Sequence, residues 1–143
     1  MQMGRYLLDT NIVAFLIHDS GDVCKDVLGI MEDYGKQIVI CGETIKELYA
    51  LYRHDRFMQR KWSNCSEMIH DFCSDFGVSV SYSAHEHYDT MLHLEWNEAE
   101  QHHDPSDLLI IAHAITERLT LVSSDRKFAF YRSQGLRLVE NKR

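Results

Sequence analysis

The sequence predicts an α/β protein, a three-layer sandwich in which a central, mainly parallel sheet is flanked by helices. Two observations carry this prediction. Short apolar runs rich in β-branched residues alternate with segments of helical periodicity, which is typical of parallel strands joined by crossover helices. Two of those runs also end directly before an acidic residue. A chain of 143 residues is long enough to bury a substantial core, so we expect a single domain over residues 1–143.

The first predicted strand, Tyr6–Leu8, runs straight into Asp9 and then into small polar residues that suit a helix start. A later run, residues 120–124, ends in the same way at Asp125. Ligands of parallel sheets bind in the crevice beyond the carboxyl ends of the strands. If both strands are parallel, the two aspartates lie at the same edge. The remaining predicted strands cover residues 37–41, 78–82 (a candidate edge strand) and 136–139.

Helical periodicity predicts helices over residues 11–17, 22–34, 42–52, 62–76, 85–96, 108–119 and 126–131. The helix that follows the second strand carries an apolar stripe with the i, i+3, i+4, i+7 spacing, made of Ile45, Leu48, Tyr49 and Tyr52. Glu47 falls beside this stripe, where it either points into solvent or reaches the sheet edge. The helix over 62–76 is expected to stop at Gly77.

The helix over residues 108–119 is apolar nearly all round, so we expect it to be buried. Asp104 suits its N-cap and Pro105 its first helical position. Asp107 then has two readings that the pattern leaves open. It either complements the helix dipole or joins the strand-end aspartates, if the loop before the helix crosses at their edge.

The charge pattern argues both for and against a nucleic-acid partner. A net charge of −7 opposes one, and residues 62–117 hold eleven acids and no Lys or Arg. The tract over residues 53–62, however, interleaves cations with aromatics, as surfaces for single-stranded nucleic acid do, although a solvated helix end has the same composition. The candidate substrate contacts are Arg53, Arg56, Arg60, Lys61, Arg126 and Lys127.

Other features exclude several classes of site. The cysteines form no CxxC pair and are expected to be buried thiols; they are Cys24, Cys41, Cys65 and Cys73. No apolar run reaches membrane-spanning length and the start has no signal-peptide pattern, so we expect a cytoplasmic protein without a membrane partner. The pair His102 and His103 suggests a metal site, but adjacent loop residues rarely ligate together, so we do not expect one.

Four carboxylates are therefore candidates for one cleft: Asp9, Glu47, Asp107 and Asp125. Each close pair of such charges repels by about 4 kcal/mol at ~4 Å and an effective dielectric near 20. A cluster of this kind either binds protons or holds a divalent cation. Oxygen ligands favour Mg²⁺ or Mn²⁺, and hydrolysis of a phosphodiester is the chemistry that suits the arrangement.

Four segments together resemble the motifs of PIN-domain ribonucleases, most closely the VapC toxins of type II toxin–antitoxin systems. They cover residues 6–11, 43–48, 104–112 and 121–125, in the order and spacing of that family and across essentially the whole chain. The resemblance implies a PIN-like sandwich and an endoribonuclease dependent on Mg²⁺ or Mn²⁺. It also implies an RNA substrate, a cognate antitoxin and a homodimer.

The resemblance also assigns roles to residues. Asp9, Glu47, Asp107 and Asp125 would form the catalytic metal cluster. Asn11 would order the first turn, and Ser123 would be a polar neighbour of the cluster. One position departs from the pattern, because Leu108 stands where many toxins of this branch carry Arg. A basic contact with the substrate is therefore not expected there.

Three other classes of protein share part of this pattern. A haloacid-dehalogenase-type phosphatase needs a second Asp two residues after the first, and this chain has Asn11. A response-regulator receiver needs paired acids after the first strand and a late Lys, and neither is evident. A non-catalytic PIN-fold domain that binds RNA or protein would be favoured by loss of one of the four acids, and none is missing.

Overall fold

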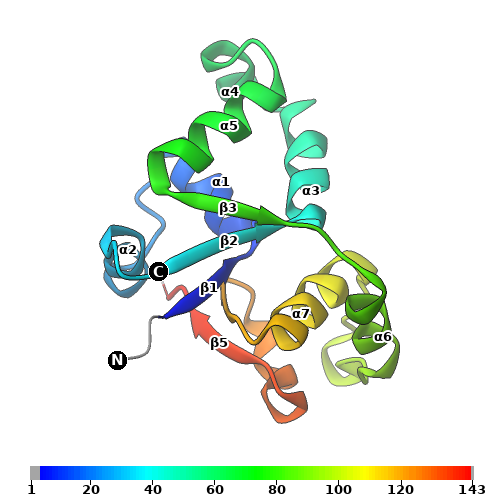
Figure 1. Ribbon diagram of the computed structural model, residues 1–143. Helices are drawn as coiled ribbons and strands as arrows, with labels where there is room; N and C mark the ends of the chain where they lie inside the picture. Colours follow the sequence, from blue (N-terminus) through cyan, green and yellow to red (C-terminus); the bar gives the residue numbers. More distant parts are fainter. Residues whose placement is uncertain (1–3, 143) are drawn as a thin grey trace.

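The computed structural model describes residues 4–142 and has at its centre a five-stranded sheet (Figure 1). Its strand order is β3-β2-β1-β4-β5, and each neighbouring pair is parallel. The predicted α/β sandwich is confirmed, and β3 is an edge strand as expected. The strands are β1 (Arg5–Leu8), β2 (Gln37–Cys41), β3 (Val78–Ser81), β4 (Thr120–Ser123) and β5 (Arg137–Glu140).

Helices cover both faces of this sheet (Figure 1). The α-helices are α1 (Thr10–His18), α2 (Lys25–Glu32), α3 (Gly42–Tyr52), α4 (Arg56–Lys61), α5 (Cys65–Phe76), α6 (His85–His93) and α7 (Pro105–Glu117). Two 3₁₀ segments complete the described elements, η1 (Glu98–Glu100) and η2 (Arg126–Gln134). Helices α1 to α5 lie with one face of the sheet, and α7 and η2 pack on the other, with α6 against α7.

The central strands are buried on both faces, which explains their continuous apolar sequence. In β1, Leu8 contributes to the core on the α1 side, whereas Leu7 contributes to the core under α7. In β2, Ile40 and Val39 divide in the same way. Successive side chains of a strand point to opposite faces, so one short apolar run supplies both hydrophobic layers.

Several predicted helix boundaries were wrong because side-chain caps override the apolar periodicity. The helix expected over 62–76 begins at Cys65, since Asn64 Oδ1 accepts a hydrogen bond from the Glu67 amide at 2.8 Å. Residues 56–61 form a separate helix, capped by Asp55 Oδ1 on the Met58 amide at 2.9 Å. Trp62 lies between the two helices and donates its Nε1–H to Asp71.

Other boundaries differ at helix ends. Helix α2 spans 25–32 rather than 22–34, and α6 ends at His93 rather than at residue 96. The segment predicted as a helix over 126–131 is the 3₁₀ segment η2 and extends to Gln134. On α3, Leu48 of the predicted stripe is buried but Tyr49 is exposed. The predicted stop at Gly77 is confirmed: it caps α5 with φ of 65°.

Two further expectations concern thiols and membranes. Cys41 and Cys65 are buried, and Cys24 and Cys73 are partly buried, so the expectation of buried thiols holds for two of the four. Burial raises the pKa of the Cys41 thiol. Within residues 4–142, no helix has the length and apolar character needed to cross a membrane.

Candidate functional site

A pocket of about 550 Å³ lies at the carboxyl ends of β1 and β4. These two strands are neighbours in register, with Leu8 opposite Val122, so Asp9 and Ser123 lie side by side where the strands end. All four acids predicted from sequence line this pocket. The lining residues are Asp9, Thr10, Asn11, Ala14, Phe15, Glu47, Ala50, Leu51, Asp107 and Asp125.

Asp9 caps α1 and is the most deeply buried of the four acids, with 4% of its surface exposed. Its Oδ1 accepts from the Thr10 amide at 2.8 Å, and its Oδ2 accepts from Ser123 Oγ at 2.7 Å and from Asn11 Nδ2 at 3.2 Å. The pKa of Asp9 is raised to about 7, chiefly by burial and in part by the charges of Asp107 and Glu47. The hydrogen bonds from Ser123 and Thr10 lower the pKa but do not offset this rise.

Asn11 and Ser123 join the two strand ends. Ser123 Oγ accepts from the Asp125 amide at 3.0 Å while donating to Asp9. Asn11 Oδ1 accepts from the Ser124 amide at 3.2 Å while its amide group donates to Asp9. Both side chains therefore contact Asp9 and the chain after β4.

Glu47 points toward the pocket from α3 and is half-buried, which settles the alternative that its place beside the apolar stripe left open. Its Oε1 accepts from Thr10 Oγ1 at 2.5 Å. Burial raises the pKa of Glu47, and the nearby charges of Asp107 and Asp104 raise it as well. Thr10 thus links two of the acids, through its amide to Asp9 and through its hydroxyl to Glu47.

Asp107 and Asp125 approach the pocket from the other two segments. Asp107 sits in the first turn of α7, which Asp104 Oδ1 caps by accepting from the Ser106 amide at 2.9 Å. Asp125 caps η2, accepting from the Lys127 amide at 2.9 Å. Burial raises the pKa of Asp107, with smaller contributions from the charges of Asp104 and Asp125. The start of α7 therefore crosses at the edge that holds the strand-end aspartates.

His102 was considered from sequence only as a partner of His103 in a metal site and was set aside, so its place beside Asp107 was not predicted. Its Nε2 lies 3.0 Å from Asp107 Oδ2, and its Nδ1 lies 3.0 Å from the Tyr131 hydroxyl. Asp107, Asp125 and His102 each offer a ligand atom within 4.8 Å of the others, whereas Asp9 and Glu47 line the same pocket outside this closest group. A loop residue has no periodicity, so no pattern in the sequence identified this contact.

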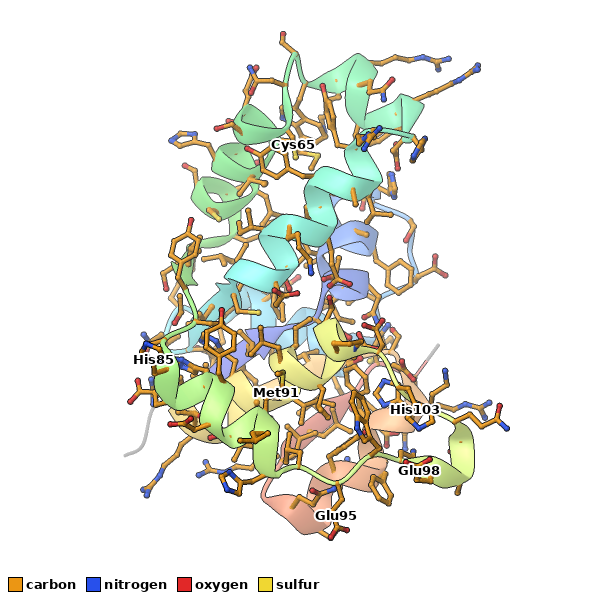
Figure 2. All side chains as sticks on the ribbon, turned by 90° about the vertical axis from the view of Figure 1, so that its right-hand side faces the viewer. Cys65, His85, Met91, Glu95, Glu98 and His103 are labelled. Carbon is orange, nitrogen blue, oxygen red and sulfur yellow. The ribbon has the colours of Figure 1, made fainter. Side chains whose placement is uncertain are left out.

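The neighbouring histidine has a different role. His103 Nε2 lies 2.9 Å from Glu98 Oε2, and both side chains lie at the η1 loop near the surface (Figure 2). The two adjacent histidines therefore have separate partners.

Among the described residues, no Lys or Arg pairs with the carboxylates of the pocket. Within 4–142, no ion pair joins Asp9, Glu47 or Asp125 to a cation, and the only such partner of Asp107 is His102. Lys46, the neighbour of Glu47 in the chain, instead contacts Glu43 Oε2 at 2.6 Å. Burial raises the pKa of Asp9, Glu47 and Asp107. Clustered carboxylates without a Lys or Arg partner are the donor set that a divalent cation suits, so the residues fit Mg²⁺ or Mn²⁺.

All six cations predicted to contact substrate are exposed and, within the described chain, free of ion pairs. Arg126 and Lys127 directly follow Asp125 at the start of η2. The others lie at or beyond the far end of α3, away from the sheet (Figure 1); they are Arg53, Arg56, Arg60 and Lys61. The structure thus divides the predicted contacts into a pair beside the pocket and a group at α4.

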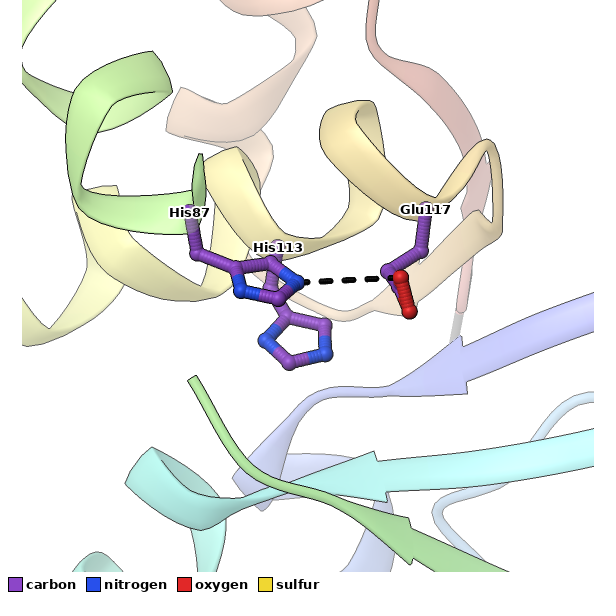
Figure 3. Close-up of side chains that lie close together, drawn as sticks. All are labelled: His87, His113 and Glu117. Atoms are coloured by element: carbon purple, nitrogen blue, oxygen red, sulfur yellow. Dashed lines mark ion pairs between the residues drawn. The ribbon is translucent and has the colours of Figure 1, made fainter. Parts of the chain in front are cut away.

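A second cluster joins His87 of α6 to His113 and Glu117 of α7 (Figure 3). The two imidazole rings are stacked, with centroids 4.1 Å apart and planes 14° from parallel. His87 Nε2 lies 3.7 Å from Glu117 Oε2. The lone pair of an imidazole nitrogen lies in the plane of its ring, so two parallel, stacked rings cannot both direct a lone pair at one ion. We therefore regard this cluster as a contact between helices.

The fold and the pocket define the class of protein: a parallel α/β sandwich with four carboxylates at the carboxyl edge of its central strands. A model of the PIN domain matches residues 6–133, and the chain belongs to the PIN domain family.

Solved structures with a similar fold include VapBC2 from Rickettsia felis bound to a DNA fragment from its promoter. That structure has a TM-score of 0.74 and 23% identity, covering 96% of this chain and 99% of that chain. DNA-bound VapBC from Salmonella typhimurium has a TM-score of 0.73 and 19% identity, covering 98% of this chain and 100% of that chain. A toxin–antitoxin complex from Klebsiella pneumoniae has a TM-score of 0.63 and 20% identity, covering 96% of this chain and 98% of that chain. These identities establish a shared fold. No curated protein sequence matches the chain.

Proposed function

We propose that this protein is an endoribonuclease dependent on Mg²⁺ or Mn²⁺, and that it acts as the toxin of a type II toxin–antitoxin module. The observation that carries the proposal is the pocket in which four acids from distant segments meet without a Lys or Arg partner among residues 4–142, His102 being the one basic side chain paired with them. Membership of the PIN domain family supports it, as does the likeness of the fold to toxin–antitoxin complexes.

Asp9, Glu47, Asp107 and Asp125 would hold the cation. A divalent cation at such a site supplies an activated water nucleophile and stabilises the negative charge that develops on the phosphate. The chain's own residues keep the acids in place: Thr10 donates hydrogen bonds to Asp9 and Glu47. Their mutual repulsion in the metal-free protein is relieved on binding, which favours occupancy.

The phosphate backbone of RNA would be contacted by the exposed cations. Arg126 and Lys127 lie next to Asp125, so they are placed to contact phosphates flanking the bond that is cut. The α4 cations would contact RNA further along the strand. Lys61 Nζ lies 5.9 Å from the centre of the exposed Phe57 ring, so charge and aromatic surface lie side by side here, whereas Trp62 is buried.

The antitoxin would cover the apolar wall of the pocket. Phe15, Ala50 and Leu51 line that wall, and the nearby Tyr49 and Phe57 are large apolar side chains that are exposed. We propose that an antitoxin segment packs there and directs a basic side chain at the carboxylates. Co-expression with the product of the neighbouring gene tests this, and a tagged toxin that recovers no partner contradicts it. Light scattering of the purified protein tests the predicted homodimer.

The test of the function is cleavage of a mixed RNA pool with Mg²⁺, with Mn²⁺ or with EDTA, followed by sequencing of the cut ends. We expect defined cuts with either cation and none with EDTA. Asp9→Asn serves as the matched protein control and should not cut. RNA binding without cleavage under every condition would instead support the non-catalytic PIN-fold alternative.

A further inference from the structure

The loop before α7 fixes the position of His102. The His102 amide donates to the Asn97 carbonyl at 3.0 Å, which closes residues 97–102 into a tight loop. The Asn97 side chain accepts from the Glu100 amide at 3.3 Å and donates to the Lys127 carbonyl at 3.2 Å, which attaches this loop to η2. As a result His102 is buried, with 3% of its surface exposed, although it lies in a loop.

A single direction of donation satisfies every hydrogen-bonding atom around His102. The Tyr131 hydroxyl accepts from the Asn97 amide at 3.1 Å, so its own proton is free to be donated to His102 Nδ1 at 3.0 Å. An imidazole that accepts at Nδ1 carries its proton on Nε2, and that Nε2–H donates to Asp107 Oδ2 at 3.0 Å. The network therefore assigns one tautomer to His102 and ends at an acid of the pocket.

We propose that His102 is a positioning residue for Asp107, and that Tyr131 holds His102 in the tautomer that this role needs. The proposal rests on the proposed function, in which Asp107 binds the cation. With Oδ2 held by His102, no hydrogen bond within residues 4–142 reaches Oδ1 of Asp107, and that oxygen remains for the cation. Ligand carboxylates that are oriented by a hydrogen bond bind metal more tightly than free ones.

A purely space-filling role for His102 makes different predictions. Its ring lies 5.7 Å from that of Phe128, centre to centre, and an apolar ring would fill this volume without a polar partner. The amide group of Gln, in contrast, can donate a hydrogen bond from nearly the place of Nε2 without filling the same volume. His102→Gln therefore keeps the donor and loses the packing, and His102→Phe keeps the packing and loses the donor.

The tautomer is tested on the metal-free protein by long-range ¹H–¹⁵N correlation of the histidine rings. We expect the proton of His102 on Nε2 in the original protein. Tyr131→Phe removes the donor to Nδ1 and should shift His102 toward the other tautomer. A proton found on Nδ1 of His102 in the original protein overturns the proposal.

Cation binding is tested by titrating each metal-free variant with Mn²⁺ in a calorimeter and by measuring kcat and KM for RNA cleavage. We expect His102→Phe to lower Mn²⁺ affinity by about 10- to 100-fold. The kcat at a fixed subsaturating Mn²⁺ concentration should fall with it, while KM for RNA stays within about twofold, because phosphate contacts are unchanged. His102→Gln should recover most of the affinity, and Tyr131→Phe should lie between the two.

Leu136→Ala is the matched control for lost stability. It creates a cavity in the same apolar cluster that contains Tyr131, without a hydrogen bond to the pocket, and should leave Mn²⁺ affinity unchanged. If the original protein binds Mn²⁺ and cuts RNA while His102→Phe matches it, only the positioning role fails. If the original protein neither binds Mn²⁺ nor cuts RNA, the proposed function fails and the positioning role fails with it.

Discussion

Among residues 4–142, two clusters bring buried histidines together with carboxylates, and they differ in what the ring nitrogens contact. In the pocket cluster, His102 Nε2 lies 3.0 Å from Asp107 Oδ2 and its Nδ1 lies 3.0 Å from the Tyr131 hydroxyl, so both nitrogens have partners. In the α6–α7 cluster, His87 Nε2 and His113 Nδ1 are buried and have no hydrogen-bond partner within residues 4–142. Short distances between potential ligands are common to both clusters, so distance alone does not identify a metal site.

The tautomer of His87 strengthens this distinction. Its Nδ1 accepts from the Ala84 amide at 2.8 Å, a side-chain cap at the start of α6. The proton of a neutral ring is then on Nε2, the atom that faces Glu117. A metal bound at that nitrogen would displace the proton to Nδ1 and break the cap. The α6–α7 cluster is therefore arranged to join two helices, whereas His102 of the pocket cluster has a hydrogen-bond partner at each ring nitrogen.

The two regions also respond to protons with opposite sign. Burial raises the pKa of Asp9 in the pocket to about 7, so acid conditions favour the folded form there. Burial lowers the pKa of His113 to about 4, assisted by the neighbouring His87, so acid conditions disfavour the folded form there. The difference follows from one cause, since burial opposes the charged form of either group.

The largest expected effect separates the clusters by activity. Asp107→Asn removes a proposed cation ligand from the pocket and should lower the rate of RNA cleavage by more than about 100-fold. Glu117→Gln removes the carboxylate of the other cluster and should leave the rate unchanged. Cleavage assays at saturating Mg²⁺ compare the two proteins. Equal losses in both variants would show that the clusters are not functionally distinct.

The second prediction concerns acid stability. The pKa of His113 falls from 6.5 unfolded to about 4 folded, so its contribution is complete above pH 6.5 and is lost as the pH falls through 4. That difference corresponds to about 3 kcal/mol. His113→Phe retains a ring against His87 but binds no proton. Between pH 7 and pH 4, its free energy of unfolding should therefore fall by about 3 kcal/mol less than that of the original protein. Urea unfolding over this range measures it, and parallel curves would contradict the assignment.

The third prediction has the opposite sign and lies in the pocket. The pKa of Asp9 rises from 3.8 unfolded to about 7 folded, so its favourable contribution is complete below pH 3.8 and is lost as the pH rises through 7. Above that pH, the ionised Asp9 carboxylate lowers the free energy of unfolding by about 4 kcal/mol. Asp9→Asn removes this cost but also loses hydrogen bonds that contribute about 1 kcal/mol each. In EDTA, the variant should gain about 2 kcal/mol over the original protein at pH 8 and should be the less stable of the two at pH 4.

Thermal melting with and without Mg²⁺ completes that test. Added Mg²⁺ should raise the Tm of the original protein, because a ligand that binds only the folded state stabilises it by RT ln(1 + [L]/Kd). The Asp9→Asn protein should show little response and no cleavage. A variant that melts markedly lower at pH 8 yet still cuts RNA would assign Asp9 a structural role only.

Local sequence patterns were sufficient to predict the sheet and the positions of two of the four acids, Asp9 and Asp125. Apolar runs that end in Asp9 and Asp125 predict buried strands and the side chains at their carboxyl ends, and adjacent parallel strands bring those ends together. Asp107 and Glu47 needed the resemblance to the PIN family, since helical periodicity left both with a surface alternative. The structure shows why they turn inward: Glu47 is bonded by Thr10 and Asp107 by His102.

The parts that could not be predicted depend on contacts between distant residues. His102 meets Tyr131, which lies 29 residues further along the chain, and neither belongs to a periodic pattern that points at the other. The observed helix boundaries differ from the predicted ones because a single capping side chain such as Asn64 decides where a helix begins, whatever the apolar spacing of the longer segment. The stacked pair of His87 and His113 likewise exists only because α6 packs on α7.

The surfaces around the two clusters extend the comparison and give the smallest expected effect. Arg126 and Lys127 adjoin the pocket and have no ion pair within residues 4–142, whereas Arg5, beside the α6–α7 cluster, donates to the Glu117 carbonyl at 3.0 Å. We expect RNA to bind at the pocket side. Each phosphate contact that is removed flattens the dependence of log binding constant on log salt concentration by about 0.7 for a single strand.

Replacing Arg126 and Lys127 together by Ala should accordingly flatten this slope by about 1.4. Replacing Arg53, Arg60 and Lys61 should flatten it by about 2 if every one of these α4 cations contacts a phosphate. Arg137 is the matched control, because it begins β5 at the opposite, amino edge of the sheet and is exposed. Fluorescence anisotropy of a labelled single-stranded RNA at several salt concentrations, with the inactive Asp107→Asn protein as background, gives the slopes. If the α4 variant matches the Arg137→Ala control in both affinity and slope, the α4 cations form only a solvated surface, and the RNA path is confined to the start of η2.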